Sequence, residues 1–188
     1  MDGVRFYALA VADGSHQMRA QPVGDGVVRI YGVVMQRDAP GVVVDQMGIP
    51  GMRGKIMLHW QEASWRAQVR QRAPDLLVFA YGTNAVGDKG APIRRFRDKW
   101  RRVLERAKAA APRASCLLVG STDRPNKPND AGQRTHRPRI DLVIAAQKEV
   151  AAEYGCAFWD AFAAMGGRGS MVRWVKFGLG RSDHVHLS

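Results

Sequence analysis

Long hydrophobic runs are missing from this chain of 188 residues. No stretch approaches the roughly 20 apolar residues that a helix needs to cross a bilayer. The first residues also lack the basic and then apolar order of a secretory signal. Any export signal would therefore have to lie outside this chain. The compartment stays unassigned, and export of a longer form to the periplasm or cell surface is compatible with the sequence.

Cysteine is also scarce, with Cys116 and Cys156 as the two residues of this type. Each lies in a short apolar run, so we interpret them as buried thiols on two strands. A bridge between neighbouring strands is the alternative in an oxidising compartment, although two cysteines do not identify that compartment. A chain of this length can bury a sizeable core, and its folding needs neither disulfides nor metals.

Acidic residues are outnumbered, with 17 Asp and Glu against 29 Lys and Arg and a net charge of +12. Such a charge favours anionic surfaces, including nucleic acid, acidic glycans and phospholipid head groups, without choosing between them. Many of the basic residues crowd positions 94–108 with helical spacing. This pattern predicts an exposed helix face, for which a solvated surface is a simpler interpretation than a specific binding site.

The first part of the chain combines β-branched residues with turn signals at Asp13-Gly14 and Gly24-Asp25-Gly26. The pattern predicts strands at 4–11, 17–23 and 27–35, which together would form a short β meander. This pattern of β-branched residues and turns ends near Pro40.

Beyond Pro40, strand and helix patterns alternate. Strands are expected at 41–47, 75–81, 115–121 and 156–159, and helices at 55–72, from 93 to Pro112, and at 140–154. Such alternation predicts an α/β fold with a parallel sheet, helices on both faces and right-handed crossovers. The continuous apolar run at 75–81 suits a strand that is buried on both faces.

Functional groups of parallel sheets collect beyond the carboxyl ends of the strands. Here those ends supply Gly51, Asn84, Asp123 and Asp160. The loop at 122–138 is too long for a simple connection, which makes it either mobile or part of the rim of a site.

Asn84 follows the strand at 75–81 in the sequence Gly82-Thr83-Asn84. Glycine allows a tight turn, and the asparagine amide placed there can donate a hydrogen bond to a ligand or to a developing oxyanion. The alternative is an asparagine that only closes a turn.

Asp183 and His186 lie three positions apart near the end of the chain. In acyl transfer a histidine accepts the proton of a nucleophilic hydroxyl, and a carboxylate on its other ring nitrogen orients the ring. This pair suits that division of labour, with His184 as a bystander. A metal-binding or merely exposed tail is the alternative.

Three motifs taken together resemble the SGNH, or GDSL-type, hydrolases: the loop Gly48 to Gly51, the turn Gly82 to Asn84, and Asp183 to His186. The resemblance implies a flavodoxin-like SGNH hydrolase fold with no cofactor. It places Gly51 and Asn84 in the oxyanion hole, His186 as the base and Asp183 as its orienting acid. The family's usual Asn-Asp is Asn84-Ala85 in this chain.

The resemblance leaves the nucleophile unknown, because the family's Gly-Asp-Ser is not found here. Ser15 is the nearest candidate, but the pattern after it predicts strands rather than the helix that the family's serine opens. We therefore expect the serine upstream of Met1. On this interpretation, residues 1–38 resemble the tail of a β-sandwich inserted in esterases that deacetylate cell-wall polysaccharides, and residues 39–188 form the hydrolase-like α/β domain, incomplete at both ends.

The resemblance thus implies a serine ester hydrolase for an acyl or acetyl ester, such as an acetylated polysaccharide. One alternative is a non-catalytic module that binds an anionic polymer through Arg94, Arg97 and Arg101. Another is an inactive remnant of an esterase. No nucleic-acid motif is visible, so nucleic acid is not an expected partner.

Overall fold

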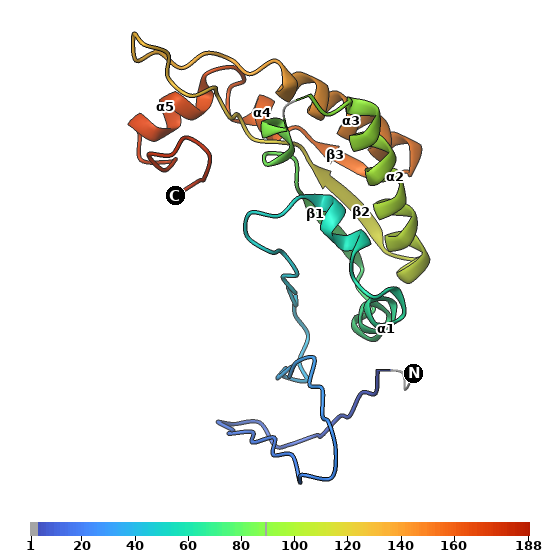
Figure 1. The fold of residues 1–188 in the computed structure, drawn as a ribbon. Helices are drawn as coiled ribbons and strands as arrows, with labels where there is room; N and C mark the ends of the chain where they lie inside the picture. The colour runs from blue at the N-terminus through green and yellow to red at the C-terminus, as the bar shows by residue number, and fades with distance from the viewer. Residues whose placement is uncertain (1–3, 89) are drawn as a thin grey trace. The chain divides into compact units, whose positions relative to one another are not determined.

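The computed structural model describes residues 4–88 and 90–188 (Figure 1). The chain divides into a unit at Arg5–Met47 and a larger unit that includes Gly48–Ser188. Within the described ranges, no helix combines the length and the apolar character that a membrane crossing requires.

The unit Arg5–Met47 contains no regular strand among its residues, so the predicted meander at 4–35 and the predicted strand at 41–47 are both wrong. Its apolar side chains are exposed, as Val27 at 93% and Val42 at 92% illustrate. β-Branched residues favour strands mainly when cross-strand neighbours cover them. That cover is missing here. A domain boundary after residue 38 remains a prediction.

A parallel sheet of three strands forms the centre of the larger unit, in the order β1 (Leu76–Ala80), β2 (Ser115–Val119) and β3 (Ala157–Trp159). Each crossover passes through a helix, because the strands point the same way. The α/β class and the parallel sheet predicted from the alternating pattern are confirmed.

Helical segments lie before, between and after these strands (Figure 1). They are η1 (Gly54–Leu58), α1 (Glu62–Arg72), η2 (Ala85–Gly87), α2 (Ile93–Ala110), α3 (Arg139–Glu153), α4 (Ala161–Ala164) and α5 (Ser170–Lys176). The single helix predicted at 55–72 is wrong, because Gln61 has an extended backbone between η1 and α1. Its side-chain oxygen accepts a hydrogen bond from Ser64 N and so begins a new helix.

The core lies between the sheet and its helices, where Phe79 and Leu118 pack with Trp100 and Leu104 of α2. Helices α2 and α3 run side by side (Figure 1). The side chains of Leu76 and Val78, by contrast, are 51% and 53% exposed. Strand β1 therefore buries one of its faces, and no helix in the described part of the chain covers Leu76 or Val78, although helices were expected there.

Cys116 and Cys156 form a disulfide, with their Cα atoms 4.7 Å apart. The register of the sheet explains the pairing, because Leu117 lies opposite Ala157 and each cysteine precedes one of these residues. The structure therefore selects the bridge, and the interpretation as two free thiols is wrong.

Candidate active site

Gln147 of α3 fixes the carboxyl ends of β1 and β2. Its side chain is fully buried, with Nε2 donating to the Tyr81 carbonyl oxygen and Oε1 accepting from Ser121 N at 3.2 Å. At Gly82, φ is +150°, and an added Cβ would lie 2.9 Å from Gln147 Oε1. The glycine is therefore required where the chain turns away from β1.

Thr83 joins the loops that follow β1 and β2. Its Oγ1 lies 2.9 Å from Thr122 Oγ1 and accepts a hydrogen bond from Thr122 N at 3.3 Å. The Ser121 hydroxyl also donates to Thr83 Oγ1 at 3.3 Å. These bonds hold the Thr83-Asn84 turn against the neighbouring loop.

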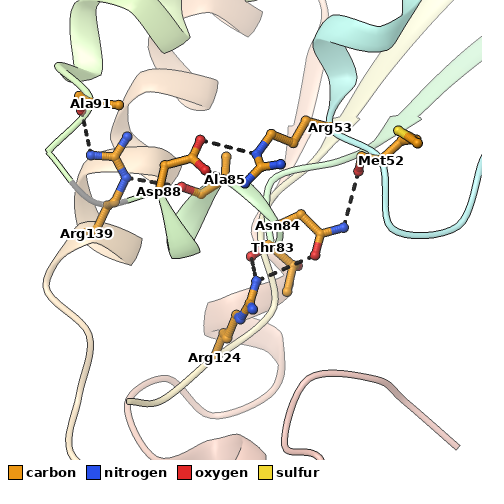
Figure 2. Close-up of polar contacts among 9 residues, drawn as sticks. All are labelled: Met52, Arg53, Thr83, Asn84, Ala85, Asp88, Ala91, Arg124 and Arg139. Carbon is orange, nitrogen blue, oxygen red and sulfur yellow. Dashed lines mark hydrogen bonds and ion pairs between the residues drawn. The ribbon is translucent and has the colours of Figure 1, made fainter. Parts of the chain in front are cut away.

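Asn84 lies between two hydrogen-bonding partners (Figure 2). Its Nδ2 donates to the Met52 carbonyl oxygen at 3.2 Å. On the other side, Arg124 Nη1 donates to the Thr83 carbonyl oxygen at 2.8 Å and lies 3.5 Å from Asn84 Oδ1. The guanidinium therefore orients the amide, with its NH₂ group toward the glycine loop.

Gly51 precedes Met52 and has φ of +75°, a conformation that favours glycine. Among residues 4–88 and 90–188, its N–H has no hydrogen-bond acceptor. The structure thus places a free backbone N–H one residue away from the carbonyl group that Asn84 contacts. Both predicted oxyanion residues belong to this corner of the molecule.

Asp183 and His186 form a direct pair, with His186 Nδ1 2.7 Å from Asp183 Oδ2. The other carboxylate oxygen accepts from Val185 N at 2.8 Å and His186 N at 3.0 Å. The hydrogen bond from the His186 side chain, together with these two backbone donors, holds the pKa of Asp183 well below its usual range. The bystander His184 turns its Nδ1 toward the Ser182 carbonyl oxygen.

The loop that carries this pair is closed by backbone hydrogen bonds. Gly180 and Leu187 form an antiparallel bridge, and Arg181 N donates to the His186 carbonyl oxygen at 2.9 Å. His186 Nε2 is left for another partner, because Nδ1 faces the carboxylate.

Arg124 connects the Asp183–His186 pair electrostatically with Asn84. Burial lowers the pKa of Arg124, as do the positive charges of Arg137 and Arg53, whereas the carboxylate of Asp183 acts in the opposite direction. Arg124 therefore lies within electrostatic reach of Asp183 while it contacts the turn of Asn84. Sequence reasoning missed this residue, because an arginine in a polar loop carries no recognisable signal.

The structure does not bring every predicted residue together. In the described part of the chain, Asp183 and His186 make no hydrogen bond with Asn84 or Gly51. Ser15 belongs to the unit Arg5–Met47 and is exposed, and no helix begins between it and η1 at Gly54.

Asp123 and Asp160, also expected at the sheet edge, serve as helix caps. The buried Asp123 carboxylate accepts from Met171 N at 3.0 Å, and Asp160 accepts from Ala163 N at 2.9 Å. Both therefore stabilise the first turn of a short helix.

A profile of the GDSL-like lipase/acylhydrolase family matches residues 15–188. The chain belongs to this family. A comparison with curated protein sequences finds no match.

Several solved structures are similar to this chain. A peptidoglycan O-acetylesterase shares 29% identity with a TM-score of 0.67 over 76% of this chain and 40% of its own. A lipase/acylhydrolase from Enterococcus faecalis (17% identity, TM-score 0.52) is matched over 73% of this chain and 63% of its own. An acetyl xylan esterase (18% identity, TM-score 0.54) is matched over 75% of this chain and 71% of its own. The chain thus spans less than half of the first of these proteins.

Proposed function

We propose that this chain supplies the base, the orienting acid and the oxyanion donors of an SGNH-type ester hydrolase. The 2.7 Å contact between His186 Nδ1 and Asp183 Oδ2 is the observation that carries the proposal. Such a contact fixes the tautomer with a proton on Nδ1, which leaves Nε2 as the proton acceptor.

In the proposed reaction, His186 Nε2 takes the proton of a serine hydroxyl as the serine oxygen attacks the ester carbonyl carbon. The Asp183 carboxylate stabilises the resulting imidazolium, which then gives its proton to the departing alkoxide oxygen. The Gly51 N–H and the Asn84 amide donate to the oxyanion that forms on the carbonyl oxygen. Water and the same histidine then release the acid from the acyl-serine and restore the hydroxyl.

For the ester itself, we propose an acyl or acetyl group carried by a polysaccharide. The support is the similarity to the peptidoglycan O-acetylesterase at 29% identity. The less similar structures, at 17% and 18% identity, support the fold alone.

We place the serine nucleophile on residues that precede Met1. The support is that Ser15, the nearest candidate within the chain, is exposed and does not open a helix, since the first helical segment after it begins at Gly54. Without a hydroxyl to activate, His186 in this chain alone would produce little or no turnover.

The test is hydrolysis of p-nitrophenyl acetate by two forms, the 188-residue chain and the chain extended by what its reading frame encodes before Met1. We expect that only the extended form hydrolyses the ester and that a fluorophosphonate probe labels a serine in the extension. Turnover of the shorter chain that Ser15→Ala abolishes would overturn the placement of the serine. An inactive extended form would overturn the esterase assignment.

The proposed binding of an anionic polymer by Arg94, Arg97 and Arg101 finds less support. Arg97 Nε lies 2.9 Å from a Glu149 oxygen, and Arg101 forms a two-point contact with Glu153. These arginines join α2 to α3, which leaves less charge for a polymer.

A further inference from the structure

A pocket of about 190 Å³ lies between η1, the loop after β1 and the first half of α2. Pockets that hold a whole small molecule usually exceed about 300 Å³, so this one is suited to a single substituent of a larger ligand. Gly54 forms part of the wall, where an added Cβ would lie 2.8 Å from the Trp100 ring. The close approach of η1 to α2 therefore depends on this glycine.

Cations dominate the lining of the pocket: Arg53, Lys55, Arg95, Lys99 and Arg139 against the single acid Asp88. Two of these cations are already occupied in the structure (Figure 2). Arg53 binds Asp88 through both oxygens. Arg139 donates to the carbonyl oxygens of Ala85 at 3.1 Å and Ala91 at 2.7 Å.

Lys55, Arg95 and Lys99 differ from them, because no carboxylate in residues 4–88 and 90–188 lies within ion-pair distance of their charges. Arg95 and Lys99 lie one helical turn apart on α2, and like charges at this spacing are unfavourable in an isolated helix. An oxyanion bound between them would remove that repulsion. The opposite side of α2 needs no such ligand, because Arg97 and Arg101 have partners on α3.

The pocket adjoins the candidate active site on two sides. Arg53 directly follows Met52, whose carbonyl oxygen accepts from Asn84, and Ala85 directly follows Asn84. The pocket thus lies close enough to Asn84 for one molecule to place an anionic group here and its ester at the candidate site.

We propose that this pocket binds an oxyanion of the substrate, a carboxylate or a phosphate ester, so that the hydrolase acts on an acidic carbohydrate. The inference rests on the proposed ester hydrolysis, because the oxyanion is taken to be part of the hydrolase's substrate. Its test measures binding and requires no turnover. Arg95 supplies a forked donor for the oxyanion, and Lys55 and Lys99 supply mobile charges beside it.

The test is calorimetric titration of the 188-residue chain with trigalacturonate, its fully methyl-esterified form and galactose 6-phosphate. We expect binding of a charged probe and none of the methyl ester. The double variant Arg95→Gln/Lys99→Gln should raise the Kd about 10-fold or more. Arg102→Gln/Arg113→Gln, which removes two exposed charges outside the pocket, should change it less than about twofold.

The two charged probes separate a carboxylate from a phosphate source. The inference is overturned if neither binds more tightly than the methyl ester, or if the control variant weakens binding as much as the pocket variant. Because hydrolysis is measured separately in the extended form, an active esterase without this binding would contradict the pocket assignment alone.

Discussion

Arg124 Nη1 donates to the Thr83 carbonyl oxygen at 2.8 Å and lies 3.5 Å from Asn84 Oδ1. One guanidinium thus holds both the backbone of the turn and the side chain that we propose as an oxyanion donor. In the proposed reaction Arg124 is a positioning residue, because it would act on the substrate only through Asn84.

Arg124→Ala should lower kcat of the extended form, which would carry the proposed serine nucleophile, about 10-fold or more while KM changes little. Loss of a whole oxyanion donor costs roughly 10² to 10³ in kcat, and a misoriented amide loses part of that. Steady-state kinetics measures the effect, and urea unfolding excludes a general loss of structure. Arg134→Ala is the matched control, because Arg134 lies in the same loop and bonds to Asn126. An unchanged kcat for Arg124→Ala would refute the positioning role.

Gln147→Leu should destabilise the chain by about 2 to 4 kcal/mol. The change leaves the Tyr81 carbonyl oxygen and Ser121 N without their side-chain partner at a buried position, and each unsatisfied group costs about 1 to 3 kcal/mol. Urea denaturation gives the free energy of unfolding. The exposed Gln133→Leu should stay within about 0.5 kcal/mol of the wild type. Equal effects of the two changes would argue against the contact.

Reduction of the Cys116–Cys156 bridge should lower the free energy of unfolding by about 4 kcal/mol. The two cysteines are 40 positions apart. A bridge that closes a loop of this length stabilises the folded state by about 4 kcal/mol, because it lowers the conformational entropy of the unfolded chain, and reduction removes this effect. Thermal unfolding with and without dithiothreitol measures the shift. The double variant Cys116→Ala/Cys156→Ala should not respond to the reductant. A wild-type chain that is equally insensitive would mean that the bridge does not form.

The Asp183 carboxyl group should titrate well below about 3.9, the value of an unperturbed aspartate. Its pKa is lower in the folded chain, mainly because of the His186 side chain. The stability that it contributes is therefore fully present above about pH 4 and is lost as the pH falls through the folded pKa. Carbon-13 NMR of the side-chain carboxyl measures this midpoint. In His186→Ala the midpoint should rise, and a normal midpoint in the wild type would exclude the pair.

The strands of the sheet could be predicted from short continuous apolar runs, and the long helices from apolar residues that repeat with a helical period. Helix α2 illustrates this, since Trp100, Val103 and Leu104 recur on one side and are all buried. The strands predicted within 4–47 could not be judged in this way, because strand propensity depends on partners that the local sequence does not specify.

The candidate site was predictable in its parts but not in its connections. Asn84, Asp183 and His186 were recognisable from short motifs. Arg124 and Gln147 were not, because their roles follow from contacts between segments distant in the sequence. The disulfide likewise depends on the register of β2 and β3, which two isolated cysteines do not reveal.

The most direct test of the proposed function compares two histidine variants in the extended form. His136 is a matched control, because its Nε2 lies 2.9 Å from Asp141 in a second histidine–aspartate pair outside the proposed site. The initial rate of p-nitrophenyl acetate hydrolysis should fall roughly 10⁴-fold or more in His186→Ala. In His136→Gln it should stay within about threefold of the wild type. A His186→Ala protein that retains the wild-type rate would contradict the assignment of His186 as the base.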